Sequence, residues 1–301
     1  MKVLVFGSLN LDRTYYVDHL ARPGETISAA SMAEFCGGKG FNQAIALRRA
    51  GLEAVFAGAV GPDGGALTAA LSANGIDHSL VQTLPGSTGH AIIQVDAQGA
   101  NNIIILAGTN GMISRERIRE VLSGFGEGDL LVAQNEISNV PFLLKTAAER
   151  GMKVAFNPSP YQESTVSACD LADVTWLLIN ETEGAGLTGE TKEESILAAL
   201  HAAWPRLTVV LTLGDRGSLL LGPDGTETRF GIYPVRAVDS TAAGDTFTGY
   251  FLEAVTRGSA PEEALRRAAA AAAISVSRKG AEPSIPGAEE VTRFMAEEDA
   301  Q

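Results

Sequence analysis

The feature that most constrains the fold is a regular alternation of apolar, β-rich segments with segments of helical pattern. The apolar segments cover about residues 2–9, 54–60, 129–134, 153–157, 174–180 and 208–213, and helix-patterned stretches such as 40–50, 64–74, 114–123, 139–150 and 192–203 separate them. Strands joined through helices run parallel, and strands buried on both faces are apolar throughout. The chain is therefore predicted to be an α/β protein with a mainly parallel sheet covered by helices.

Two stretches, about 11–36 and 87–106, break this alternation because they are strand-like with no helix between. We expect them to form a small separate sheet. Open α/β sheets bind ligands at the strand ends, so a small sheet placed there would serve as a lid. No linker or internal repeat divides the 301 residues. A single domain spanning 1–301 is expected.

The charge balance limits the partners of the chain. The formal net charge is −13, and no block of five or more like charges occurs. A nucleic-acid partner is therefore not expected, and an anionic substrate would have to be held by local donors. No apolar run approaches the roughly 18 residues of a membrane span, so no membrane association is expected.

The cysteines and histidines point away from disulfide and zinc chemistry. Cys36 and Cys169 are too few for a disulfide framework and lack C-x-x-C spacing, so a reducing cytoplasm is the simplest compartment. No two histidines are three or four residues apart, so we expect neither a zinc centre nor a catalytic histidine. The histidines are His19, His78, His90 and His201.

The segment Asp239-Ser-Thr-Ala-Ala-Gly-Asp-Thr-Phe-Thr-Gly249 places two carboxylates around a glycine turn. After Asp245, apolar residues recur at i, i+3, i+4 and i+7, the pattern of a half-buried helix. Small residues before that helix leave its first N–H groups approachable, and such a helix start attracts phosphate. The alternative is that an aspartate here only caps the helix.

A second glycine cluster, Gly37-Gly-Lys-Gly-Phe-Asn-Gln43, precedes another predicted helix. It is not a P-loop, because Lys39 is followed by glycine rather than by serine or threonine. Adjacent glycines allow the backbone to touch a small polar ligand, while Lys39 and Asn42 supply donors. A simple turn and helix cap is the alternative.

Asn10 and Asp12 follow the first predicted strand and are two residues apart, so in an extended chain they share a face. A carboxylate beside an amide is suited to gripping vicinal hydroxyls. This pattern is a weak signal, and ordinary turn chemistry also explains it.

Three further motifs occur in the second half of the chain. Asn180 and Glu183 have the spacing of a capping box. Gly184–Gly189 matches G-x-G-x-x-G, but it lies inside a predicted helix with no acid about 20 residues on, so a dinucleotide enzyme is disfavoured. The loop Thr212–Ser218 joins two apolar strands, and its N–H groups either follow phosphates or form an ordinary hairpin turn.

With these motifs in order, the chain resembles the ribokinase-like (PfkB-type) sugar kinase family, most closely its ribokinase branch. Two signatures carry the resemblance, Gly37-Gly-Lys-Gly-Phe-Asn-Gln-Ala44 and Ala237-Val-Asp-Ser-Thr-Ala-Ala-Gly-Asp-Thr-Phe247. Asn180-Glu-Thr-Glu183 and Arg278-Lys-Gly-Ala-Glu-Pro-Ser284 agree with it in order and spacing.

The resemblance implies a three-layer α/β sandwich with a β-sheet lid that transfers the γ-phosphoryl group of ATP to the 5-hydroxyl of D-ribose. Asp245 matches the family's general base, and the N–H groups of Ala242, Ala243 and Gly244 match its anion hole. Mg²⁺ and K⁺ are the implied cofactors.

The resemblance also assigns the remaining positions. Those on the sugar side are Asn10, Asp12, Gly38, Lys39, Gly40, Asn42 and Glu136, with Asp245 at the reactive hydroxyl. Those on the nucleotide side are Asn180, Thr212, Gly214, Asp215, Arg216, Gly217 and Gly244. Asn180 and Glu183 would order the water shell of Mg²⁺. The implied potassium ligands are Asp239, Thr241, Ser275, Arg278, Gly280 and Ser284.

The substrate and the assembly remain expectations. Phe41 replaces a residue that is usually small in the family, and His90 and Gln94 on the lid are unusual, so another sugar or a nucleoside stays an alternative to ribose. A non-catalytic sensor of sugar or nucleotide is a third reading. Exposed lid edges favour strand pairing, so a homodimer through the lid sheets is expected.

Overall fold

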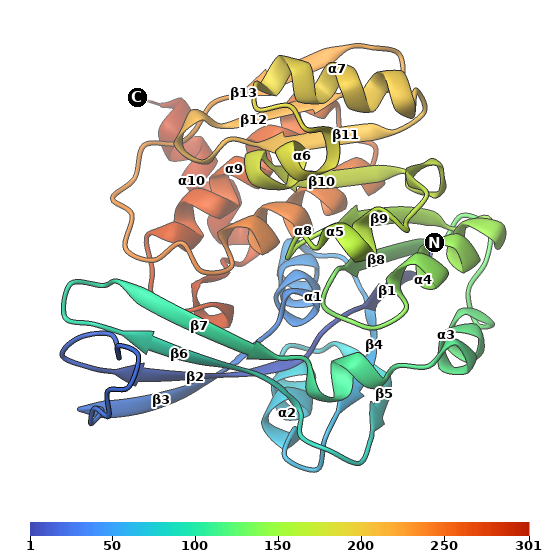
Figure 1. The fold of residues 1–301 in the computed structure, drawn as a ribbon. Helices are drawn as coiled ribbons and strands as arrows, with labels where there is room; N and C mark the ends of the chain where they lie inside the picture. The colour runs from blue at the N-terminus through green and yellow to red at the C-terminus, as the bar shows by residue number, and fades with distance from the viewer. Residues whose placement is uncertain (301) are drawn as a thin grey trace.

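The computed structural model describes residues 1–300, and a nine-stranded sheet forms the centre of that part of the chain (Figure 1). In spatial order the strands are β13 (Glu227–Phe230), β12 (Ser218–Leu221), β11 (Thr208–Thr212), β10 (Trp176–Asn180), β9 (Lys153–Asn157), β8 (Leu130–Gln134), β1 (Val3–Phe6), β4 (Val55–Val60) and β5 (Asp77–Thr83). The strands from β11 to β5 pair in parallel, whereas β12 and β13 are antiparallel. Only short loops precede β12 and β13, too short for the crossover that a parallel strand needs.

Helices cover both faces of this sheet and create two hydrophobic cores. One core contains side chains of α1 (Lys39–Ala50), α2 (Gly65–Ala73), α8 (Ala243–Thr256), α9 (Pro261–Val276) and α10 (Ala288–Asp299). The other contains side chains of α3 (Arg115–Leu122), α4 (Val140–Glu149) and α7 (Glu193–Ala203). The remaining α-helices are α5 (Glu163–Val166) and α6 (Glu181–Thr188). The predicted three-layer α/β class is confirmed.

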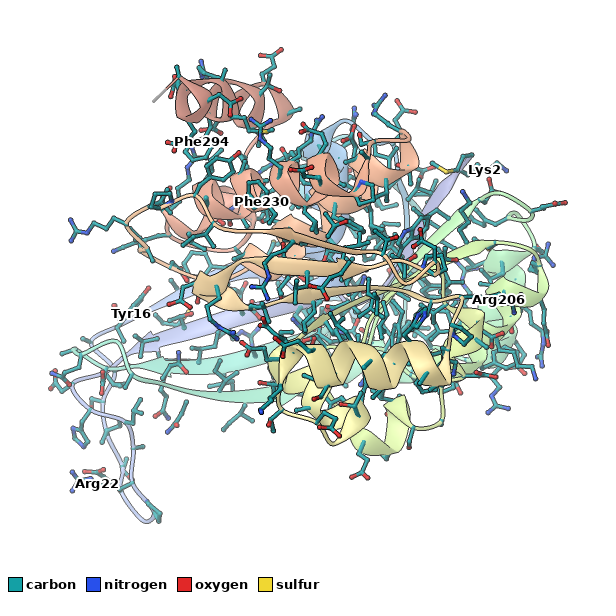
Figure 2. All side chains as sticks on the ribbon, turned by 90° about the horizontal axis from the view of Figure 1, so that it is seen from above. Lys2, Tyr16, Arg22, Arg206, Phe230 and Phe294 are labelled. Atoms are coloured by element: carbon teal, nitrogen blue, oxygen red, sulfur yellow. The ribbon has the colours of Figure 1, made fainter. Side chains whose placement is uncertain are left out.

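A smaller four-stranded sheet projects from one side of the body (Figures 1 and 2). Its order is β3 (Ser31–Gly37), β2 (Asn10–Tyr16), β6 (Gly89–Val95) and β7 (Asn101–Leu106). These strands come from the two stretches that break the alternation, although residues 17–30 between β2 and β3 form a loop rather than strand. In register, Asn10 pairs with both Gly37 and Gly89, so the small sheet begins where α1 begins.

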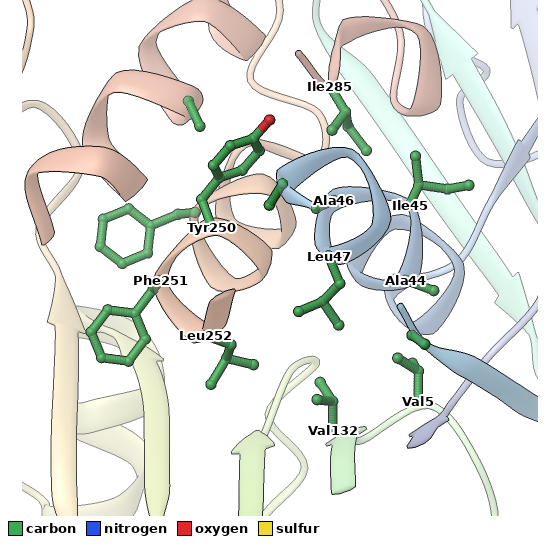
Figure 3. Packing of buried hydrophobic residues seen from close by; sticks show 14 of the residues in the cluster. Val5, Ala44, Ile45, Ala46, Leu47, Val132, Tyr250, Phe251, Leu252 and Ile285 are labelled. Carbon is green, nitrogen blue, oxygen red and sulfur yellow. The ribbon is translucent and has the colours of Figure 1, made fainter. Parts of the chain in front are cut away.

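The contact between α1 and α8 depends on small residues at the crossing point. A Cβ added at Gly249 would overlap Ala46 and lie 2.8 Å from the backbone nitrogen of Leu47. Figure 3 shows the two helices side by side, with Leu47 and Leu252 directed toward Val132 and Val5 of the sheet. This close approach brings the first turns of α1 and α8 together.

The predicted helix around the alanine run is α9, and both of its faces use small side chains. Ala268, Ala270 and Ala271 have no exposed surface and pack in the core. Ala269 and Ala272 line a cavity on the other side.

Cys36 and Cys169 are both free thiols. Within residues 1–300, no helix has the length and apolarity required to cross a membrane.

Candidate active site

Asp245 lies in the first turn of α8 and is 6% exposed. Its two carboxylate oxygens accept hydrogen bonds from α1: Asn42 Nδ2 donates to Oδ2 at 3.2 Å, and Gln43 Nε2 donates to Oδ1 at 2.9 Å. The two glycine-containing signatures of the sequence therefore meet at one carboxylate. A cavity of about 250 Å³ opens beside it, lined also by Lys39, Asn180 and Glu183.

The start of α8 has the backbone form expected of an anion site. Ala242 has φ 61°, a left-handed conformation at the helix cap, and Gly244 borders the cavity with open space where a Cβ would stand. The N–H of Ala243 donates to the carbonyl of Ser240 at 3.2 Å. Ala243 is thus partly engaged, and the N–H groups of Gly244 and Asp245 are the first-turn donors that face no intrahelical acceptor.

Residues on the predicted sugar side are held by buried polar contacts. Asn110 Nδ2 donates to Asn10 Oδ1 at 2.8 Å. The carboxylate of Glu136 accepts the Lys39 N–H at 2.8 Å and the hydroxyl of Ser8. Gly38 has φ 98°, which favours glycine, and a Cβ at Gly40 would lie 2.6 Å from Gly7 Cα. Asn42 Oδ1 is buried and has no hydrogen-bond partner.

Asp12 lies against Gly37, where an added Cβ would overlap its carboxylate. Burial, and secondarily the negative charge of Glu136, raises the pKa of Asp12 to about 7 from an ordinary 3.8. Asp12 therefore keeps its proton to near neutral pH in the sugar-free protein.

We expect this carboxyl to make the protein less stable as pH rises. Between 3.8 and about 7 the unfolded chain has released the proton that the folded chain still holds, so the free energy of unfolding falls through this window and levels off above it. The contribution is at most about 1.4 kcal/mol per pH unit. Urea unfolding of the wild type and Asp12→Asn, from pH 4.5 to 8, measures it. The stability difference should move in favour of the variant as pH rises, and a constant difference would contradict the prediction.

Lys39 carries its charge into the cavity. Burial by itself lowers the pKa of its ammonium, but the carboxylates of Asp245, Glu136 and Glu183 outweigh burial and raise that pKa. The side chain therefore stays cationic between the predicted sugar side and the predicted nucleotide side. The sequence had placed Lys39 only among sugar contacts.

The nucleotide-side residues lie along the ends of β10 and β11. Asn180 and Glu183 form the predicted capping box, in which each side chain accepts the other's backbone N–H at 2.9 Å. Gly214 and Gly217 have φ of 60° and 89°. Together with Thr212 and Asp215 they border a second cavity of about 760 Å³, whose far wall is the apolar face of α9 and the loop 231–237. Arg216 points elsewhere and pairs with Glu181 and Glu193.

The residues of the predicted potassium site come together behind the start of α8. Asp239 accepts the N–H groups of Thr241 and Gly280, both at 2.9 Å. Burial raises the pKa of this carboxyl, but the hydrogen bonds from Thr241 and Gly280 outweigh it, so the net pKa is lowered. The buried hydroxyls of Ser275 and Ser284 are 2.9 Å apart. The Arg278 side chain pairs with Glu290 and its N–H donates to the Ser275 carbonyl, so only its backbone carbonyl is left for this site.

Several polar residues at the site were missed from the sequence. Ser8 and Asn110 hold Glu136 and Asn10, while Gln134 and Asn157 lie beneath Gln43. A weak signal existed for some of them, because Gln134 and Asn157 are polar residues that end apolar strands. The contact partners are distant in sequence, so spacing does not reveal them.

A profile of the pfkB family carbohydrate kinases matches residues 1–288. The chain belongs to this family. A ribokinase of Haemophilus influenzae is 35% identical over 300 residues, which cover 97% of this chain and 97% of the relative. The structure of ribokinase from Thermotoga maritima superposes with a TM-score of 0.87 at 36% identity and covers 98% of this chain and 99% of that one. Arabidopsis thaliana ribokinase, complexed with ribose and ATP, gives a TM-score of 0.85 at 32% identity and covers 98% of each chain.

Membership in the pfkB family confirms two further predictions. The protein is a phosphotransferase with an alcohol group as acceptor, and its fold is ribokinase-like. Phe41, the bulky residue in the family's first signature, has no exposed surface and belongs to the core that α1 shares with α8. It supports the helix behind the site rather than lining either cavity.

Proposed function

We propose that this protein is an ATP-dependent kinase that transfers the γ-phosphoryl group to the 5-hydroxyl of D-ribose. The observation that carries the proposal is the position of Asp245, which accepts hydrogen bonds from Asn42 and Gln43 of α1 and borders the cavity at the start of α8. A general base must reach both the acceptor hydroxyl and the phosphoryl group. The ribose and ATP held by the Arabidopsis relative are the ligands that this arrangement would take.

In the proposed reaction, Asp245 accepts the proton of the 5-hydroxyl as its oxygen bonds to the γ-phosphorus. The bond between that phosphorus and the bridging oxygen breaks, and ADP leaves with the electron pair. The N–H groups at the start of α8 and the Lys39 ammonium face the negative charge that spreads over the transferring group. Asn42 Nδ2 donates to Asp245 and holds its carboxylate in place for this step.

Magnesium fits the nucleotide side as a mostly hydrated ion. Residues 1–300 contain no group of three or more carboxylate, histidine or cysteine ligands placed for a metal, whereas Mg²⁺ commonly keeps several waters and binds through phosphates. Glu183 borders the cavity and Asn180 caps the same helix, so these two would hold its water shell. When bound, the ion neutralises charge on the phosphates.

Potassium fits the cluster around Asp239 because its donors are hard oxygens from three segments of chain. Asp239, Ser275 and Ser284 supply a carboxylate and two hydroxyls, and Thr241 and Gly280 are already bonded to Asp239. A bound ion would stiffen the loop that leads into α8, and backbone carbonyls at Thr241 and Arg278 would complete its shell.

A neutral sugar suits the site better than a sugar phosphate. Lys39 is the only cation among the proposed sugar contacts, whereas a second phosphate would need further arginine or lysine. Phe41 lies in the core and lines neither cavity, so this bulky residue is no argument against ribose. Another pentose or a nucleoside remains the second candidate, because the lid carries His90 and Gln94.

An ADP-release assay over a panel of sugars and nucleosides tests the proposal. Ribose should give the highest kcat/KM, with more activity in potassium than in sodium. Turnover of another sugar but not ribose would overturn the substrate assignment. Binding of sugar and ATP without any ADP release would instead indicate a non-catalytic sensor.

The small sheet is also the surface that we propose for a homodimer in the cytoplasm. All six residues of β7 are exposed, and Ile104 is 66% exposed. The other three strands carry large apolar side chains that are 37–53% exposed, namely Tyr16, Met32, Phe35 and Ile92. An exposed apolar edge strand favours pairing with a second copy, and the lid would then close over the sugar from both chains.

Ile104→Lys is expected to separate this dimer into monomers, because burying an unpaired ammonium at the interface is costly. Size-exclusion chromatography with light scattering measures the mass. Gln98→Lys, in the exposed turn between β6 and β7, adds the same charge outside the apolar surface and should leave the mass unchanged. A wild-type mass of one chain would refute the assembly.

A further inference from the structure

Two buried glutamines lie beneath the proposed general base. Gln43 on α1 has no exposed surface, and Gln134 at the end of β8 is 1% exposed. A buried amide is costly unless its hydrogen bonds are made, so such side chains in a core need a partner that justifies them. We propose that Gln43 and Gln134 form a hydrogen-bond relay that positions Asp245 for proton abstraction, an inference that rests on the proposed kinase reaction.

The chemistry of Asp245 sets the direction of the relay. An ionised carboxylate only accepts, so Gln43 must turn its NH₂ group toward Asp245, and it does so at 2.9 Å. Gln43 Oε1 is then directed the other way and can only accept. Gln134 Nε2 donates to it at 2.7 Å. The carboxylate therefore sets the orientation of the Gln43 amide, and Gln43 in turn sets the orientation of the Gln134 amide.

The second proton of the Gln43 amide connects the relay to the next strand. Gln43 Nε2 also donates to Asn157 Oδ1 at 3.3 Å, and Asn157 Nδ2 donates to the carbonyl of Leu178 at 2.8 Å. Gln134 and Asn157 are register partners on β8 and β9. The relay thus fixes Gln43 to two rigid strands, so the position of α1 against the sheet is transmitted to Asp245.

Space for the relay comes from glycine. A Cβ at Gly7 would overlap Gln134 Oε1, and Gly7 is itself in contact with Gly40 of α1. Gln134 Oε1 has no hydrogen-bond partner, so the hydrogen-bond relay ends at this atom. The unpaired polar atom of the two glutamines therefore belongs to Gln134, which reaches Asp245 only through Gln43.

Gln43 and Gln134 either position Asp245 or only fill space in the core. If they position Asp245, the effect of Gln134 on kcat must pass through Gln43. We expect Gln43→Met, which keeps the volume and removes the donor, to lower kcat roughly 10- to 100-fold with little change in sugar Kd, since a small displacement of a reacting group costs rates of this order. Gln134→Met should lower kcat less, because Gln43 keeps its bond to Asp245.

The double variant decides between the two roles. Gln134 is expected to matter only through Gln43, so the double methionine variant should lose no more kcat than Gln43→Met. Losses that multiply, or a Gln43→Met enzyme within twofold of wild-type kcat, would overturn the relay. Gln98→Met on the exposed turn is the matched control, and thermal melting verifies that each variant is folded.

A measurement without turnover separates the relay from the reaction. The chain has seven glutamines, so selective ¹⁵N labelling of glutamine gives a short set of side-chain NH₂ signals, and Gln43→Met assigns the one of interest. Asp245→Asn should shift that signal, and Gln134→Met should shift it too. Coupled signals in a protein that phosphorylates no sugar would refute the proposed function, whereas an active enzyme with uncoupled signals would refute the relay.

Discussion

Asp245→Asn is expected to lower kcat by about 10²–10⁴, the contribution typical of a general base, while sugar binding stays near that of the wild type. The amide keeps the size of the carboxylate, but it cannot take the hydroxyl proton. It also presents an NH₂ group where Asn42 and Gln43 both donate, so one of those hydrogen bonds is lost. ADP release measures the rate, and calorimetric titration with ribose measures binding.

Asp18→Asn is the control for this variant, because Asp18 is an exposed aspartate on the small sheet's loop. It should retain full activity. Turnover by Asp245→Asn above about 10% of the wild-type rate would be too much for the loss of a general base and would remove Asp245 from that role. A loss of sugar affinity equal to the loss of kcat/KM would assign it to binding instead.

The second large effect is expected at the helix crossing. Gly249→Leu should lower the free energy of unfolding by about 1–3 kcal/mol or more, because the added side chain meets Ala46 and the backbone at Leu47, neither of which can rotate away. Moving α8 away from α1 also separates Asp245 from Asn42 and Gln43. A displacement near 1 Å at a reacting group costs about 10²-fold in rate, so the folded variant should be a poor enzyme.

Urea unfolding and kcat, measured under conditions where the variant is folded, test both parts. Gly65→Leu is the matched control: Gly65 begins α2, and no atom lies within 4 Å of an added Cβ. It should leave stability and rate close to those of the wild type. A Gly249→Leu protein with wild-type stability would show that the crossing tolerates separation.

The secondary structure was predictable wherever a segment is apolar on both faces or regularly periodic. The six predicted strands and the predicted helices correspond to β1, β4, β8–β11 and to α1–α4 and α7. β5 and β13 were missed because they are edge strands with exposed, polar residues, and α10 because charged residues dominate it. The small sheet followed from the gap in the alternation, while its use as a lid remains a prediction.

By itself, the sequence determined the family, the α/β class and the residue types that carry the proposed chemistry, because glycine turns, helix caps and apolar runs act over a few neighbouring residues. Only the tertiary structure decided which side chains touch Asp245. Gln43 and Asp245 are 202 residues apart, and Gln134 is 91 from Gln43. Their contact depends on the crossing of α1 and α8 over β8, a packing of surfaces that no local spacing encodes. The direction of the hydrogen bonds then follows from the carboxylate, which can only accept.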